Sequence, residues 1–444
     1  MIIFILGPSP VFRDMKREVL LGIVAAVIVV AVAVAFVVPN LFVQGRPAPQ
    51  EIVVGAALPM SGSFSQIGLY FKNGFELYFS EVNKNGGVYV KEFDKRIPIR
   101  LVVYDDESDP TKSATQLERL ITVEKVHLIL GGYSTPLVQA QAPVAERYKM
   151  PYINPGGATS TIFLTEDGKR RYQYMFGLIA SIKNLALTTI EMLKQEIDAG
   201  RLPKPLKIAT VNENTDHGRE YLAGLREGAR KYPGYFEIVY EAFYNIGEKD
   251  FTPILTAIKQ SGANAMLNDM RLGDYITMHR QYTTLGLCHL IVSYGPRGPE
   301  GRAIQELGEA AENVFGVQWW NPSDPRPEVQ EFNRKWEAWV KERNLNLPSD
   351  WFAAISYEAA RTLVWAIEKA GSIDPDAVWK ALRTLDSPQN GLKPSIVVGG
   401  AIYFPEESGG QITNPFVVVQ VQDGKPVIVY PKESATGTFR VNKC

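Results

Sequence analysis

The stretch VHLILGGYSTPLVQAQAPVAERYKMPYINPGGATS (126–160) decides the fold class of this chain. A short aliphatic run ends before Gly131, a segment of helical length extends from Pro136 to Tyr148, and a second short run begins at Pro151. Strands that alternate with helices in this way are typical of βαβ units, in which the strands form a parallel sheet. The sequence therefore predicts an α/β protein with parallel sheets flanked by helices.

The same alternation extends outward from this stretch in both directions. Toward the N-terminus, strands are expected at 52–58 and 97–104 and helices at 66–83 and 111–124. Beyond Phe176 a second series is expected, then a helical block and a return to strands. These elements are helices 181–198, 218–231, 252–260, 273–285, 325–343, 350–370 and 375–385, and strands 206–211, 236–243, 264–267, 289–293, 313–319, 396–403, 415–421 and 426–430. Two α/β series followed by a helical block and further strands indicate two lobes between which the chain crosses more than once.

Composition excludes several classes of protein. Of 444 residues, 45% are apolar, and 47 basic residues balance 48 acidic ones. So much apolar surface supports a folded core, and the absence of excess positive charge argues against nucleic-acid binding. Only Cys288 and Cys444 carry sulfhydryl groups, too few for a cysteine-based metal site. Cys288 precedes an expected strand and is predicted to be a buried free thiol.

An uncharged run at residues 20–38 predicts the compartment. As a helix it would measure about 28 Å, close to the thickness of a bilayer core. Arg13, Lys16 and Arg17 precede it, so the positive-inside rule places residues 1–19 in the cytoplasm and the rest of the chain outside.

Two interpretations of this run remain open. It is either a transmembrane anchor or the core of a signal peptide, with cleavage possible after Ala35. Translation starts at Met1 or at Met15. Residues 39–50 are expected to form an extended tether, and the chain beyond it is expected to lie in the periplasm or on the outer cell surface.

Two loops are candidate ligand sites, because ligands bind beyond the carboxyl ends of strands in such sheets. In the loop before Pro136, Ser134 or Thr135 is expected to cap the following helix, whose free N–H groups would suit an anion. In the loop at 154–160, Gly156 and Gly157 would let a ligand approach the backbone. A plain capped turn and a bare loop are the alternatives.

Catalytic motifs are absent from the sequence. It contains no G-x-S-x-G, H-E-x-x-H, P-loop or G-x-G-x-x-G motif, and its four histidines are scattered. The acidic segment 105–110 lacks calcium-loop spacing and is expected to end a strand and cap a helix through Ser108 or Asp109. His217, at a strand-to-helix turn, is either a cap or a ligand contact. The sequence predicts a protein without catalysis, cofactor or metal.

Taken together, the residues resemble the Leu/Ile/Val-binding family of extracytoplasmic solute-binding proteins, the receptors of ABC importers. The matching stretches cover nearly all of 51–430 in family order. They are VVGAALPMSGSFSQIG (53–68), EVNKNGGV (81–88), LVVYDDESDPTKSATQLERLI (101–121), ILGGYS (129–134), PVAERYKMPYINPGGATS (143–160), EKDFTPILTAIKQSGANA (248–265) and ISYEAARTLVWAIEKAGS (355–372).

The resemblance implies a type I periplasmic-binding fold whose lobes close on a small solute. Three crossovers are then expected, near residues 177, 320 and 417. Lobe 1 would comprise 51–177 and 320–417, and lobe 2 would comprise 178–319 and 418–444. The implied partners are the solute and the permease and ATPase subunits of an ABC transporter. The alternative is the ligand-sensing ectodomain of a membrane receptor complex.

Site residues carry over from the family by position. The loops with Tyr133, Ser134 and Thr135 and with Gly156 and Gly157 would take the carboxylate of an amino acid. Either Ala158 or Thr159 supplies the hydroxyl position of the second loop. On the other side of the cleft, His217 stands where the family often has tyrosine, Met270 stands where it has an aromatic residue, and Arg297 replaces an ammonium-binding acid. Ser61, Ile67 and Arg271 are further candidates.

The replacement at Arg297 leads to a hypothesis about the solute. A guanidinium would repel an α-ammonium group, so an organic or aromatic acid fits better than a branched-chain amino acid. An amide or urea-type solute is a further possibility. In the alternative, Arg297 points away, and Glu300, Asp269 or Asp274 receives the ammonium group.

Overall fold

The computed structural model describes residues 47–444. The predicted cytoplasmic segment 1–19, the membrane segment 20–38 and most of the tether lie outside the described residues. Within 47–444, no helix is both long and apolar enough to cross a bilayer. Residues 50–444 form one compact unit.

A five-stranded parallel sheet is built largely from the first α/β series. Its strand order is β4-β1-β5-β6-β7. The strands are β1 (Ile52–Leu58), β4 (Ile99–Asp105), β5 (Leu128–Leu130), β6 (Tyr152–Asn154) and β7 (Met175–Gly177), and the helices of this series are α2 (Ser65–Lys84), α3 (Pro110–Thr122) and α4 (Thr135–Arg147). β1 is almost wholly buried, as expected for a parallel strand covered on both faces. A two-stranded ribbon of β2 (Val88–Val90) and β3 (Lys95–Ile97) joins α2 to β4.

A seven-stranded sheet, in the order β14-β13-β12-β11-β10-β8-β9, follows in the second series. Its strands are β8 (Leu206–Glu213), β9 (Phe236–Tyr244), β10 (Ala265–Asn268), β11 (Ile291–Tyr294), β12 (Phe315–Gln318), β13 (Val417–Gln422) and β14 (Lys425–Tyr430). The helices are α5 (Ile182–Asp198), α6 (Asp216–Lys231), α7 (Thr252–Ser261), α8 (Leu272–Thr284) and α9 (Gly301–Leu307). The first five strands in chain order are parallel, whereas β13 and β14 are antiparallel.

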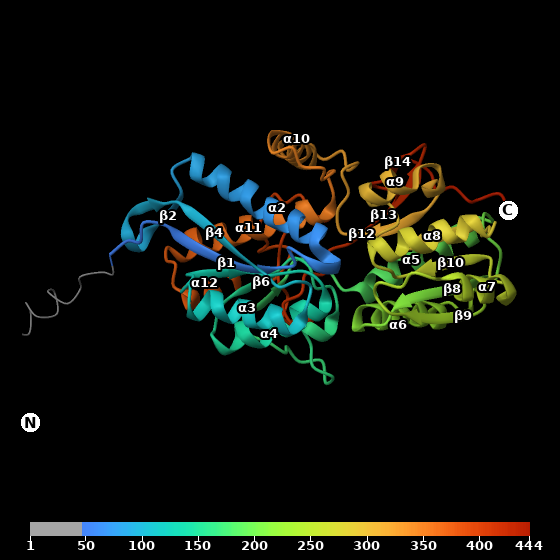
Figure 1. Ribbon diagram of the computed structural model, residues 1–444, viewed down its shortest axis with the longest axis horizontal. Helices are drawn as coiled ribbons and strands as arrows, with labels where there is room; N and C mark the ends of the chain where they lie inside the picture. Colours follow the sequence, from blue (N-terminus) through green and yellow to red (C-terminus); the bar gives the residue numbers. More distant parts are fainter. Residues whose placement is uncertain (1–46) are drawn as a thin grey trace, which may run out of the picture. The chain divides into compact units, whose positions relative to one another are not determined.

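Three α-helices separate β12 from β13 in the chain. They are α10 (Pro327–Glu342), α11 (Trp351–Ala370) and α12 (Pro375–Leu382). α11 packs against α2 of the first series, as Figure 1 shows, and β13 then pairs with β12 of the seven-stranded sheet. A long, mostly buried α11 therefore belongs to the core beside the five-stranded sheet, although it lies late in the sequence.

The predicted α/β fold with parallel sheets flanked by helices is confirmed, but the strand expected at 396–403 is wrong. That segment forms turns with a single bridge between Leu392 and Ile402. Gly399 and Gly400 have φ values of 88° and 69°, which interrupt an extended backbone. The Arg326 guanidinium also binds the carbonyl oxygens of residues 395–397, which therefore do not form a strand ladder.

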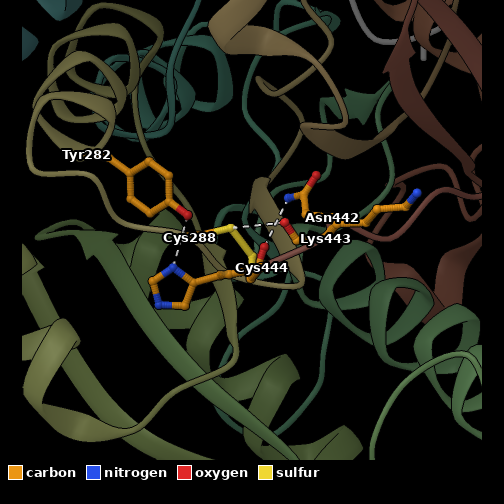
Figure 2. The surroundings of a disulfide bond; sticks show 6 residues. Tyr282, Cys288, Asn442, Lys443 and Cys444 are labelled. Carbon is orange, nitrogen blue, oxygen red and sulfur yellow. Dashed lines mark hydrogen bonds between the residues drawn. A yellow bond between two sulfur atoms is a disulfide. The ribbon is translucent and has the colours of Figure 1, made fainter.

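The prediction that Cys288 is a buried free thiol is wrong in both respects, because Cys288 is exposed and is not free. Cys288 and Cys444 form a disulfide across 156 residues of sequence (Figure 2). The C-terminal tail returns to the start of β11, where the Asn442 N–H donates to the Leu290 oxygen over 2.9 Å. The side-chain amide of Asn442 donates to the carbonyl oxygen of His289 over 3.0 Å. Local sequence around Cys288 carries no sign of this tail, which explains the error.

Candidate functional site

Side chains from the ends of three parallel strands meet at one point. Tyr133 follows β5 in the five-stranded sheet, Arg271 follows β10, and Arg297 follows β11 in the seven-stranded sheet. Arg271 Nη1 donates to the Tyr133 hydroxyl over 3.0 Å, and Arg297 Nη2 donates to the same oxygen over 2.8 Å. All three residues are buried. Two guanidinium groups from one sheet therefore converge on a single oxygen from the other.

A cavity of about 310 Å³ opens beside these three residues. Phe64, Ile67, Phe352, Leu272 and Ile276 form its apolar walls. Its polar lining consists of Ser63, Ser65, Gln66, Thr277, Arg280, Arg302 and Glu306, in addition to Tyr133, Arg271 and Arg297. This volume and this mixture of apolar walls with a few polar groups are typical of small-molecule sites.

Aromatic rings fix the position of Tyr133. Phe64, Phe71 and Phe352 contact its ring edge-to-face at centroid distances of 5.6–5.8 Å. The Arg297 guanidinium lies 5.3 Å from the ring centroids of both Trp351 and Phe352. Aromatic faces attract guanidinium groups, so the rings hold the arginines as well as the tyrosine. Trp351 is buried beneath Arg297 rather than exposed in the cavity.

A carboxylate lies behind each arginine. Arg271 Nη2 donates to Glu213 Oε1 over 2.6 Å, and Arg297 Nη1 donates to Glu300 Oε1 over 3.0 Å. Burial opposes ionisation of both arginines, but Glu213 and Glu300, together with Tyr133, raise their pKa values, so both stay charged. The carboxylates hold the arginines in position while one edge of each guanidinium faces Tyr133.

His217 lies at the start of α6, behind Arg271. Its Nδ1 is 2.6 Å from Asp269 Oδ2. Burial opposes ionisation of Asp269, but His217 and Arg271 outweigh it and hold the pKa of Asp269 below its ordinary value. Potential ligand atoms of Glu213, His217 and Asp269 lie within 4.8 Å of one another, a set that suits a metal ion by residue type. Because Glu213 pairs with Arg271 and Asp269 with His217, this set fits a charge network better than a cation site.

The two predicted loops lie close together, but their polar groups are largely satisfied internally. Thr135 Oγ1 and Thr159 Oγ1 are 2.8 Å apart, and the N–H groups of Gly156 and Gly157 donate to Asn154 Oδ1. A Cβ at Gly156 would lie 2.7 Å from the Gly132 oxygen, so glycine here lets the two loops approach each other.

The prediction that the Ser134 or Thr135 side chain caps α4 is wrong. Ser134 occupies the N-cap position with φ 86°, but its hydroxyl makes no capping bond. Within the described chain its Oγ is buried without a hydrogen-bond partner. The Thr135 hydroxyl bonds to Thr159 instead, so tertiary contact replaces capping. By contrast, Asp109 caps α3 as predicted by accepting from the Lys112 N–H.

The structure brings some predicted site residues to the cavity and not others. Those that line it are Ile67, Tyr133, Arg271 and Arg297. The predicted residues that are buried but do not line it are Ser134, Thr135, Gly156, Gly157, Ala158, Thr159 and His217. Met270 packs into the hydrophobic core, and Ser61 is exposed outside the cavity lining.

Sequence reasoning missed Phe64, Phe352 and Glu213. Phe64 lies three residues after Ser61, a further candidate, and Glu213 lies two residues beyond the predicted strand 206–211, so both carried a signal. Phe352 reaches the cavity only through the packing of α11 beside α2, for which the sequence gives no local sign.

Comparison with known proteins agrees with this architecture. The sequence model described as periplasmic binding protein matches residues 51–426. A curated relative, the Leu/Ile/Val-binding protein homolog 8 of Brucella abortus, is 24% identical over 400 residues, covering 88% of this chain and 94% of the relative. The chain therefore belongs to the periplasmic binding protein family, whose members bind solutes outside the cytoplasm.

Two solved structures show the same fold. A branched-chain amino acid transporter substrate-binding protein from Streptococcus pneumoniae, in complex with isoleucine, has a TM-score of 0.72 at 19% identity, covering 86% of this chain and all of that one. A solute-binding protein of an ABC transporter from Rhodopseudomonas palustris, in complex with 3,4-dihydroxybenzoic acid, has a TM-score of 0.71 at 23% identity. It covers 85% of this chain and 95% of that one.

Proposed function

We propose that this protein is the substrate-binding component of an ABC importer and that its solute is a small carboxylic acid without an ammonium group. The observation that carries this proposal is the convergence of Arg271 and Arg297 on the Tyr133 hydroxyl at the wall of the cavity. Guanidinium groups bind carboxylates through paired, charge-assisted hydrogen bonds. The apolar walls would then enclose the body of the solute.

The charges around the cavity argue against an amino acid. Among the residues that line the cavity, Glu306 carries a carboxylate, and both Arg280 and Arg302 bind it. The other candidate acids are engaged elsewhere: Asp269 with His217, and Glu300 with Arg297. Asp274 accepts from the Gly247 N–H. An α-ammonium group entering this cavity would meet guanidinium groups before any free carboxylate.

The wider role follows from the family. We propose that the two sheets form the cores of two lobes, with crossovers near 177, 320 and 417, and that the lobes close on the solute and deliver it to a permease. Hydrogen bonds already link the two sides: the Gln139 amide donates to Asp216 over 2.8 Å, and the Ser160 N–H donates to Glu220 over 2.8 Å. The relatives that carry isoleucine and 3,4-dihydroxybenzoic acid define the two solute classes to compare. The uncharged, apolar run at residues 20–38 supports anchoring of the chain in the membrane.

The test is a thermal shift and calorimetry panel on the purified chain. We expect benzoate and 3,4-dihydroxybenzoate to bind, because ligand at 100 times Kd stabilises the native state by about 2.7 kcal/mol. Isoleucine and leucine are expected to give no shift. Binding of the aliphatic amino acids alone would contradict the assignment of an acid, and no binding by any member of the panel would contradict the receptor role.

A further inference from the structure

Two carboxyl groups, those of Glu300 and Asp350, are buried directly behind Arg297. Glu300 precedes α9, and Asp350 precedes α11. Each side chain contacts the residue that follows the other: Trp351 Nε1 donates to Glu300 Oε1 over 3.1 Å, and the Gly301 N–H faces the Asp350 carboxyl. This reciprocal arrangement holds the two carboxyl groups close together, with exposed fractions of 1% for Glu300 and 5% for Asp350.

The positive charge available to this pair is insufficient for two carboxylates. Arg297 donates to Glu300 through Nη1, but its Nη2 is directed to Tyr133. Across residues 47–444, Glu300 Oε2 and Asp350 Oδ1 are left without hydrogen-bond partners. The other charged or titratable groups that interact with the pair are Arg271, Tyr70 and Tyr275. Two ionised carboxylates in such a place would repel each other with little solvent to separate them.

Protonation removes this repulsion. Burial raises the pKa of Glu300 despite the opposing effect of Arg297, and burial together with Glu300 raises the pKa of Asp350 well above its ordinary value. Groups that interact this strongly titrate as a pair rather than singly. A cavity of about 20 Å³ bordered by Asp350 and Trp351 is large enough for one water molecule and would allow proton exchange.

We infer, on the basis of the proposed function, that Glu300 and Asp350 share one proton and that loss of this proton weakens the binding of an anionic solute at Arg297. The released proton leaves an additional negative charge behind the guanidinium. That charge competes with the solute for the same cation, so affinity falls as pH rises. By linkage, solute binding takes up a proton.

Calorimetry on the full chain with benzoate as the probe tests this inference. From about pH 5.5 to about pH 8.5 benzoate stays ionised, and buried carboxyl groups can titrate in this range. We expect the wild-type affinity to fall on the order of tenfold across the range. Asp350→Asn keeps an N-cap side chain of the same shape and removes the titrating group, so its affinity for benzoate should change little with pH.

The matched control is Asp106→Asn. Burial raises the pKa of Asp106 to about 6, but this residue bonds to Ser113 beyond β4 and does not line the cavity. Its variant should keep the pH dependence of the wild type. A pH dependence that persists unchanged in Asp350→Asn would overturn the inference while leaving the receptor role intact.

A second measurement covers the case in which Asp350→Asn does not fold. Infrared spectroscopy of the wild type without solute should show a protonated carboxyl band near neutral pH that disappears as pH rises, together with a loss of benzoate affinity. Absence of such a band overturns the inference. If the chain binds none of the solutes, both the proposed function and this inference are overturned. If it binds benzoate but shows no such band, only this inference is overturned.

Discussion

The two sides of the cavity recognise a solute by different chemistry. The side built on the five-stranded sheet contributes neutral groups, Tyr133 and the aromatic rings of Phe64 and Phe352, while the Thr135 hydroxyl is buried outside the cavity lining. The side built on the seven-stranded sheet contributes the guanidinium groups of Arg271 and Arg297, each backed by a buried carboxylate. Neutral hydroxyl and aromatic groups enclose many solutes, whereas a buried charge strongly excludes solutes of the wrong sign. The second side should therefore determine which solute is bound.

The largest expected effect concerns a covalent difference between the two sides. The Cys288–Cys444 disulfide ties the tail to the seven-stranded sheet. Chain-entropy estimates for a loop of this length give about 5 kcal/mol of stabilisation, and removal of native disulfides usually costs about 2–5 kcal/mol. We expect Cys288→Ser and Cys444→Ser to lower the melting temperature by the same amount. Reductant should not change the melting temperature of either variant. Equal melting temperatures for wild type and variants would contradict a stabilising bond.

Next in size is the effect of reversing the charge at Arg297. Arg297→Glu removes a donor and adds a carboxylate beside Glu300, so benzoate affinity should fall by about 3 kcal/mol, measured by calorimetry. Arg280→Glu makes the same change of charge at a cavity position whose side chain is 56% exposed, and it should cost less than about 1 kcal/mol. Equal losses in the two variants would show that Arg297 has no special role.

One buried group on each side should respond to pH in opposite directions. On the five-stranded side, burial raises the pKa of Asp106 to about 6, so its contribution to stability is complete below the ordinary value of 3.8 and is lost as pH rises through about 6. On the seven-stranded side, burial lowers the pKa of His279 to about 4, so its contribution is present above the ordinary value of 6.5 and is lost as pH falls through about 4. Each effect should be on the order of 3 kcal/mol.

Chemical denaturation across pH measures both effects. Asp106→Asn should reduce only the decrease in unfolding free energy at higher pH. His279→Gln should reduce only the decrease at lower pH. A single variant that flattened both limbs would refute the assignment of these titrations to separate regions.

The smallest expected effect concerns the neutral side. Thr135→Val leaves the Thr159 hydroxyl without its partner in a buried place, which should cost about 1 kcal/mol of unfolding free energy. The double variant Thr135→Val, Thr159→Val should recover part of this loss, since both polar groups are then removed. Benzoate affinity should change less than in Arg297→Glu. A larger loss of affinity in Thr135→Val would reverse the comparison between the two sides.

Sequence periodicity predicted most helices and strands within a few residues, because the pattern of apolar residues follows the burial of each element. The failures were non-local. Residues 396–403 are rich in β-branched side chains, yet Arg326, from another part of the chain, binds the carbonyl groups of Ile396 and Val397. The free thiol at Cys288 failed because the tail returns from residue 444.

The sequence by itself determined the α/β fold and the family. Each of these depends on residue order and local periodicity, which are written in the chain. Only the tertiary structure decided that Arg271 and Arg297 converge on Tyr133, that Glu213 and Glu300 lie behind them, and that Phe352 closes the cavity wall. These contacts join residues far apart in sequence, and the distances that set their electrostatic energies exist only after the sheets and helices have packed.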